Sequence, residues 1–402
     1  MHSMPKTCLV LALLLIGGIC PFEVGVFAQE DVIARTADGP TAQTDAKKEA
    51  EKKTEEPEDN YQFAVSYNIA CTDVKSQDKT GTCWSFATAS FIESELIRRG
   101  KGQHDLSEMF IVKNIYRDKV QNYVLRQGKA NFSQGALGHD FMQSAHRHGL
   151  VPEEVFSGRE NDKEKYDHGE MEAAMAGFLA AVAKRTTLTN KWDLACDRIL
   201  DVYMGESPKR FTYQGRSYTP KEFAQSLEFR GQDYAHITSY THHPFYEPFV
   251  LEIPDNFSNG SFDNLPIDDL VEIIDTAIKN GYSVAWDGDV SEKGFSSSKG
   301  IAVLPKDPAR EDLFTTPGEE IESDQAMRQK TFMTFSTTDD HLMHLVGISQ
   351  DAAGNKYYMI KNSWGERGPH KGFIHMSEAY VRLKTIAIIV HKDAIPARLR
   401  RN

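Results

Sequence analysis

The sequence is poor in several features that would each define a class of protein. It has 402 residues but only five cysteines, and its formal net charge is −12. The low cysteine content excludes a disulfide-dense scaffold, and an acidic surface disfavours nucleic acid or an anionic membrane as the main partner. It has no internal repeat and no apolar run of membrane-spanning length. Collagen, a coiled coil and a multi-span membrane protein are therefore excluded.

The N-terminal 28 residues have the pattern of a secretory signal peptide. Lys6 precedes an apolar run from Cys8 to Cys20, which is too short to span a bilayer comfortably. Val26-Phe27-Ala28 then offers small residues at the −3 and −1 positions of a cleavage site. We therefore expect residues 1–28 to be removed and the mature protein to be periplasmic or secreted. The alternative is a lipid anchor at Cys20, which the large residue before it disfavours.

A polar segment follows the expected cleavage site. Residues 29–58 consist mostly of Lys, Glu, Asp, Thr, Ala and Pro, with very few large apolar side chains. Such a composition buries too little apolar surface to offset the entropy lost on ordering. We expect a disordered linker here, and a folded domain over residues 59–402.

Three cysteines remain after the expected cleavage, namely Cys71, Cys83 and Cys196. An odd number leaves at least one free thiol in an exported protein. Whether Cys71 pairs with Cys196 stays open at this point.

The folded part changes from helical to strand-rich patterns along the chain. Apolar periodicity predicts helices at 83–99, 106–121, 138–148, 170–185 and 267–279, with a further helix start at Thr219. Strands are predicted at 249–253, 282–287, 341–349, 356–361, 372–376 and 385–391. This order predicts an α+β fold with two unlike halves. The helical half spans 59–159, a helical insertion spans 160–265 and the strand-rich half spans 266–402.

Three short segments carry residues that together could form a catalytic site. Gln77 lies six positions before Cys83, which opens a predicted helix, and His341 and Asn362 follow much later in the chain. A helix N-terminus stabilises the thiolate form of a cysteine. An imidazole can move the thiol proton, an amide can hold the imidazole, and a second amide such as Gln77 can face the oxyanion. Each segment alone is weak, but in this order they predict nucleophilic catalysis.

These segments resemble the papain-like cysteine peptidases. Gly81-x-Cys83-Trp84-x-Phe86-Ala87 is similar to the nucleophile segment of that family, and Asn362-Ser363-Trp364-Gly365 is similar to its asparagine segment. Residues 242–256 and 277–290 are similar to the bleomycin hydrolase and aminopeptidase C branch. The resemblance covers roughly residues 61–391.

The resemblance implies a papain-like fold of two subdomains and a catalytic triad of Cys83, His341 and Asn362. It also implies that Gln77 lines the oxyanion hole and that Trp364 shields the bond between His341 and Asn362 from water. No cofactor or metal is expected. Peptides are the implied substrates, aminopeptidase activity is the implied reaction, and a homo-oligomer, a hexamer in the family, is the implied assembly.

Two histidines compete for the catalytic position. In the resembled family the histidine lies six residues before a glycine, which selects His341 because Gly347 follows it at that spacing. His341 and His344 differ by an odd number, so on a regular strand they face opposite sides. We therefore place His344 on the face away from the cleft, and a zinc pair of the two is the weakest alternative. Asp339 and Asp340 either raise the pKa of His341 or form a solvated turn.

The C-terminal tail departs from the resembled branch. In that branch a long C-terminal arm enters the cleft, and its carboxylate receives the free amine of the substrate. Here only residues 392–402 follow the last predicted strand. The resemblance places them near the cleft, whereas the basic run Arg398–Arg401 would repel an incoming amine.

Two alternatives to an exported aminopeptidase therefore stay open. One is an exported papain-like endopeptidase, which the short tail favours. The other is a catalytically inactive peptide-binding protein on the same scaffold, which the intact set of Gln, Cys, His and Asn residues disfavours. In each case we expect no nucleic-acid partner and no integral membrane segment after removal of the signal peptide.

Overall fold

The computed structural model describes residues 60–161 and 164–400. The expected signal peptide 1–28, the alternative anchor at Cys20, the linker 29–58 and the C-terminal Asn402 lie outside the described residues. Within the described residues, none of the helices combines the length and the apolar character needed to cross a membrane.

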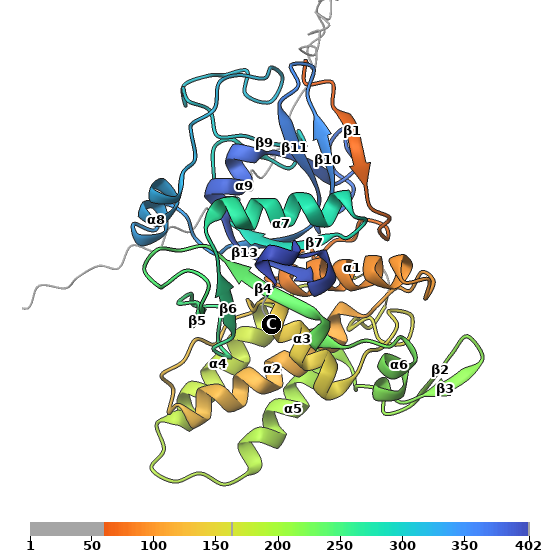
Figure 1. Cartoon of the computed structure of the whole chain (residues 1–402). Coiled ribbons are helices and arrows are strands. Elements are labelled where there is room, and N and C mark those ends of the chain that lie inside the picture. The colour runs from red at the N-terminus through yellow and green to blue at the C-terminus, as the bar shows by residue number, and fades with distance from the viewer. Residues whose placement is uncertain (1–59, 162–163, 401–402) are drawn as a thin grey trace, which may run out of the picture. The chain divides into compact units, whose positions relative to one another are not determined.

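The described chain is built on a mixed sheet in which ten strands follow one another in space and β1 is added beside β10 (Figure 1). In spatial order the strands are β5 (Pro248–Val250), β6 (Ser261–Asn264), β4 (Tyr234–Thr238), β13 (Thr385–His391), β7 (Val284–Gly288), β10 (His341–Gln350), β11 (Lys356–Lys361), β12 (Phe373–Ser377), β9 (Ile301–Ala302) and β8 (Phe295–Ser296), with β1 (Ala64–Asn68) paired to β10. A separate hairpin joins β2 (Phe211–Tyr213) and β3 (Arg216–Tyr218).

The first six helices lie together, and Figure 1 shows α2 to α5 in its lower part and β9 to β11 in its upper part. They are α1 (Cys83–Arg98), α2 (Glu108–Leu125), α3 (Gly138–His148), α4 (Gly169–Ala183), α5 (Lys191–Met204) and α6 (Pro220–Ser226). The later helices are α7 (Ile267–Lys279), α8 (Gln325–Met333) and α9 (Glu378–Lys384). The α+β layout expected from the sequence is confirmed, since helices dominate the early part of the described chain and paired strands the late part.

Two hydrophobic cores lie on the two faces of the sheet. Ala285 of β7 and Leu342 of β10 belong to the core shared with α1, α2 and α3. Trp286 and Met343, the next residues along each strand, belong to the core under α7. This separation follows from strand geometry, because successive side chains point to opposite faces. Helices α1 and α7 therefore cover opposite faces of the same strands.

Local signals explain where several helices begin and end. Thr219 and Glu222 form a capping box at the start of α6, in which each side chain accepts a hydrogen bond from the other residue's N–H. Helix α7 ends at Lys279 before Asn280 and Gly281, and Gly281 has φ +85°. Glycine adopts this left-handed conformation without the steric cost that a Cβ imposes.

Residues 160–265 differ from the helical insertion that the sequence predicts. Helices α4, α5 and α6 lie there, but so do β4, β5 and β6, which extend the main sheet beside β13. Strand β4 was missed because it is five residues long and its pairing partner β13 lies about 150 residues later. No range was predicted for the helices α5, α8 and α9 or for the strands β1, β2, β3, β6, β8 and β9.

Strand β1 joins the early part of the chain to the strand-rich half. It pairs with the second part of β10, with Asn68 opposite Gly347. A Cβ added at Gly347 would lie 2.5 Å from the carbonyl oxygen of Tyr67. This glycine is therefore needed for the close approach of the two strands.

Candidate active site

Cys83 is the first residue of α1, where the helix leaves the loop that contains Gln77. The carbonyl of Thr82 accepts hydrogen bonds from the N–H groups of Ser85 and Phe86 and so starts the helix. The Cys83 side chain is 8% exposed. This burial raises the pKa of the thiol to about 12, against the lowering effect of a hydrogen bond from the Leu342 backbone. The thiol therefore lies next to the start of β10.

His341 and Asn362 are joined by a hydrogen bond of 2.8 Å between Nε2 and Oδ1. If Nε2 donates this proton, Nδ1 is left with a free lone pair that can accept one. Both residues are buried, and burial lowers the pKa of His341 to about 4 although the bond to Asn362 raises it. Of the two alternatives left open for Asp339 and Asp340, an increase of this pKa is not found, because burial and the bond to Asn362 are the causes of its shift.

Trp364 lies beside this pair, as the sequence predicts. Its ring centroid is 4.6 Å from that of His341, at an interplanar angle of 33°. Phe295 contacts the indole with an edge-to-face geometry. The indole thus covers one side of the imidazole that bonds Asn362.

Gln77 links the nucleophile segment to the asparagine segment. Its Nε2 donates to the carbonyl of Thr80 at 2.6 Å, and its Oε1 accepts from the hydroxyl of Ser363 at 2.7 Å. Its backbone N–H donates to the carbonyl of Ser363. Since an amide nitrogen carries two hydrogens, one remains for a ligand after the bond to Thr80.

His344 lies on the opposite side of β10 from His341, as strand alternation predicts. It is fully buried, and its Nδ1 is 2.8 Å from the hydroxyl of Ser90 on α1. His341 instead contacts Asn362 and Trp364. The two imidazoles therefore do not form the zinc pair that was the weakest alternative.

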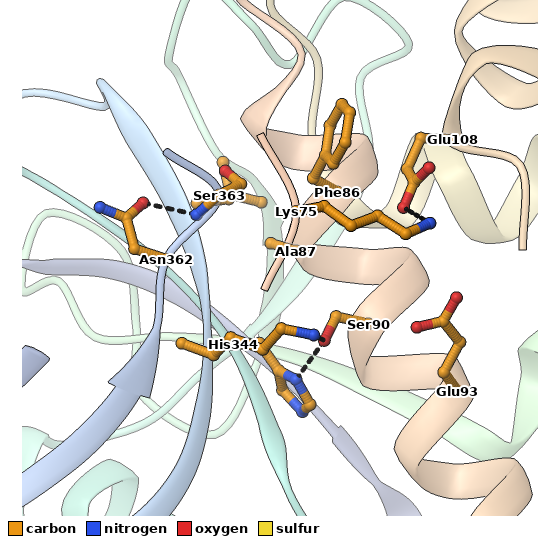
Figure 2. Close-up of a pocket in the computed structure, with 11 residues that line it drawn as sticks. Lys75, Phe86, Ala87, Ser90, Glu93, Glu108, His344, Asn362 and Ser363 are labelled. Atoms are coloured by element: carbon orange, nitrogen blue, oxygen red, sulfur yellow. Dashed lines mark hydrogen bonds and ion pairs between the residues drawn. The ribbon is translucent and has the colours of Figure 1, made fainter. Parts of the chain in front are cut away.

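A buried polar cluster, Lys75, Ser90, Glu93, Glu108, His344 and Lys361, lies around a small cavity between α1 and β10 (Figure 2). The ammonium of Lys75 is 2.8 Å from Glu108, and that of Lys361 donates to Ser90 at 2.9 Å. Glu93 accepts a hydrogen bond from the N–H of Leu106.

No local pattern indicates this cluster, because its members are spread over almost 290 residues of the sequence. It ties α1 and α2 to β11, whose last residue, Lys361, precedes Asn362. The cluster therefore helps to fix the position of Asn362 relative to α1.

The other two cysteines of the described residues are free. Neither Cys71 nor Cys196 forms a disulfide, so the pairing that the sequence left open does not occur. Burial raises the pKa of both thiols.

One group of side chains in the described part could hold a metal ion. His242, His243 and Glu252 each offer a ligand atom, and these atoms lie within 4.8 Å of one another. Without an ion, both imidazoles hydrogen-bond the Glu252 carboxylate, at 3.2 Å and 2.6 Å. The group does not include Cys83, His341 or Asn362.

The sequence matches two family models over almost its whole described length. The model of the papain family cysteine proteases matches residues 60–204, and that of the peptidase C1-like family matches residues 197–402. The second match covers 206 residues, from 197 to 402, which is just over half of the 402. The chain belongs to the peptidase C1-like family.

Relatives place this peptidase C1-like chain in the aminopeptidase C and bleomycin hydrolase branch. It is 24% identical to aminopeptidase G of Lactobacillus delbrueckii subsp. lactis over 376 residues, which cover 81% of this chain and 82% of that protein. It is 25% identical to human bleomycin hydrolase over 221 residues, which cover 50% and 47% of the two chains.

A solved structure has the same fold. PepW from Lactobacillus rhamnosis HN001 superposes with a TM-score of 0.65 and 20% sequence identity, over 84% of this chain and 83% of that one. Together with the family matches, this makes the protein a papain-like cysteine-type peptidase.

Proposed function

We propose that this peptidase C1-like protein is an exported cysteine aminopeptidase whose triad is Cys83, His341 and Asn362, with Gln77 in the oxyanion hole. The observation that carries the triad is the 2.8 Å bond between His341 Nε2 and Asn362 Oδ1. His341 is the first residue of β10, and the backbone of the next residue, Leu342, hydrogen-bonds Cys83. These two contacts support a site in which a nucleophile, a base and an orienting amide act together.

In this mechanism the Cys83 proton moves to Nδ1 of His341, and the sulfur attacks the carbonyl carbon of the substrate. The C–N bond then breaks, and His341 returns the proton to the leaving amine. This leaves a thioester on Cys83. Water, deprotonated by His341, hydrolyses the thioester, and the returned proton restores the thiol.

The oxyanion of the tetrahedral intermediate would be held by the backbone N–H of Cys83 and the free amide hydrogen of Gln77. The bonds from Gln77 to Thr80 and Ser363 support this role, because they fix the amide before substrate arrives. Donors that need no reorganisation stabilise developing charge more than mobile ones do.

Aminopeptidase specificity is supported by the names of the relatives, aminopeptidase G among them. The second candidate is an endopeptidase, and the described part of the tail favours it. Arg398 donates to Asp269 at 2.8 Å and also contacts Glu272, so the tail is bound to α7. Helix α7 covers the face of the sheet opposite α1.

Cleavage of a peptide library with free and with blocked N-termini separates these functions. An aminopeptidase cleaves only the free series, and an endopeptidase cleaves both. Cys83→Ala should lower the rate by at least about 10³-fold in either case. A wild-type protein that cleaves neither series, although Cys83 reacts with iodoacetamide, would instead be a peptide-binding protein.

Export and assembly are further parts of this proposal. The pattern of residues 1–28 supports export to the periplasm or the medium, and N-terminal sequencing of the exported protein should begin at Gln29. If the exported protein instead begins at Cys20 and carries a lipid on that residue, the protein is lipid-anchored and not released. The proposed homo-oligomer rests on the family resemblance, and the solution mass of the mature protein tests it.

A further inference from the structure

Asp287 is an acidic residue on the face of the sheet that the first helices cover. It lies on β7 two positions after Ala285, which belongs to the same core as Cys83. Its register partners, Leu342 on β10 and Ala387 on β13, also belong to that core. Asp287 is 4% exposed. A carboxyl group in such surroundings is costly unless something binds it.

Asp339 is the partner of this carboxyl group. It lies two residues before His341, in the loop that leads into β10, and its side chain hydrogen-bonds Asp287. Oδ1 of Asp287 and Oδ2 of Asp339 are buried, and outside the pair itself neither oxygen has a hydrogen-bond partner among the described residues. Buried polar atoms of native proteins are almost always paired, so these two oxygens point to a missing ligand.

The surroundings of the pair are acidic. The charges that act most on it come from Asp255 and Asp340, and both raise the pKa values of the two carboxyl groups. The buried guanidinium of Arg328 does not compensate them, because it stacks on Tyr240 and donates to backbone carbonyls such as that of Ser239. The chemistry of the missing ligand is therefore that of a cation that can donate hydrogen bonds.

We propose that the carboxyl groups of Asp287 and Asp339 bind the free α-ammonium of the substrate's N-terminal residue. The inference rests on the proposed peptidase function and adds the residues that would make the enzyme an aminopeptidase. Neither residue takes part in bond cleavage.

The position of the pair fits this role. In an aminopeptidase the α-nitrogen lies two bonds from the carbonyl carbon that the nucleophile attacks, a distance of about 2.5 Å. The group that receives it must therefore lie beside the nucleophile. Leu342, opposite Asp287 in the sheet, hydrogen-bonds Cys83, and both acids raise the pKa of the Cys83 thiol.

The charge also fits. Two adjacent carboxyl groups that share a proton carry about one negative charge, which matches one ammonium. The described tail lies along α7, on the other face of the sheet. The acid pair would thus take the role that the resembled branch gives to the carboxylate of its C-terminal arm.

The preference for a free amine should depend on pH. Burial raises the pKa of Asp339 to about 7 and raises that of Asp287 well above its usual range. The pair therefore gains its negative charge as the pH rises through about 7. A peptide α-amine loses its charge near pH 8. The ionisable groups that face Asp339 are those of Cys83, Tyr240, Asp255, Asp287 and Asp340. The preference should be largest between about pH 7 and 8.

The test compares labelling of Cys83 by leucine chloromethyl ketone and by its N-acetyl analogue, measured by mass spectrometry at pH 7.5. The wild-type protein should react at least about tenfold faster with the free amine. Asp339→Asn and Asp287→Asn should bring the ratio of the two rates close to one. Asp340→Asn, in the same loop, should keep the wild-type ratio. Asp339→Asn is the safer variant for folding, because this loop residue is partly exposed.

Each outcome decides the proposal. Equal rates with both reagents in the wild type would overturn amine recognition and leave the peptidase function standing. No labelling by either reagent, while iodoacetamide still modifies Cys83, would overturn the proposed function and this inference with it. A third arm compares N-acetyl-Arg-Leu and N-acetyl-Ala-Leu chloromethyl ketones. Faster labelling by the arginine reagent would reassign the acid pair to a basic side chain of the substrate.

Discussion

At the scale of single residues, Cys83 and Cys196 have similar burial but different neighbours. Burial raises the pKa of each thiol to about 12. Cys83 begins a helix and lies beside β10, whereas Cys196 lies inside α5. A helix N-terminus favours thiolate, and the imidazole of His341 can take the thiol proton, so these two effects oppose burial at Cys83 alone.

We therefore expect iodoacetamide to modify Cys83 at least about tenfold faster than Cys196 at pH 7. The rate at Cys196 should keep rising with pH, because its thiolate forms only as the pH approaches 12. His341→Ala should lower the rate at Cys83 at pH 7 and leave the rate at Cys196 unchanged, because only Cys83 is proposed to pass its proton to an imidazole. Equal profiles for the two cysteines would show that Cys83 is an ordinary buried thiol.

The two histidines of β10 give a second prediction. His341→Ala should lower kcat/KM about as much as Cys83→Ala, since members of a catalytic unit do not act additively. His344→Ala should change the rate by less than about tenfold. It should instead lower the free energy of unfolding by about 1–3 kcal/mol, because Ser90 loses one of its two buried partners and keeps only Lys361. Measurements of kcat/KM and of urea unfolding on both variants test this. If His344→Ala loses more activity than His341→Ala, the catalytic histidine is His344.

At the scale of elements, α1 presents an acidic residue to the buried polar cluster. Burial raises the pKa of Glu93 to about 7, although Lys75 lowers it. The folded protein therefore holds a proton that the unfolded chain releases near pH 4.5. Folding stability should fall as the pH rises from about 4.5 to 7, because the folded state binds more protons in this range.

Glu93→Gln should remove this part of the pH dependence, by at most about 3 kcal/mol. The glutamine can still accept the hydrogen bond from Leu106. Glu95→Gln on the same helix is the matched control, since Glu95 is paired with Arg98. Thermal unfolding from pH 4.5 to 8 measures both. If the dependence of stability on pH is the same in Glu93→Gln as in the wild type, Glu93 is ionised throughout this pH range.

At the scale of the whole molecule, the tail and the first helices lie on different faces of one sheet. Deleting residues 397–402 should leave the ratio of free to acetylated substrate cleavage unchanged. The loss of Arg398 should change the stability little, because the guanidinium that pairs with Asp269 and Glu272 is exposed and water screens the pairs. Matched peptides and urea unfolding test this. A shift toward acetylated substrates in the truncated protein would mean that the chain end reaches the active site.

The sequence alone determined the features that depend on neighbouring residues. Helix α7 begins and ends where predicted, and α1 begins at Cys83, because the apolar period and the end signals are local. The opposite orientation of His341 and His344 follows from strand alternation, and the structure confirms it. The motif around Cys83 was enough to indicate the family.

Only the tertiary structure decided what depends on residues far apart in the chain. Strands β1 and β4 are too short to be recognised without their partners β10 and β13. The pKa of His341 is set by burial and not by the adjacent acids. Asp287 and Asp339 are 52 positions apart, and only the pairing of β7 with β10 brings them together. Burial and strand pairing are properties of the packed chain, which no local pattern contains.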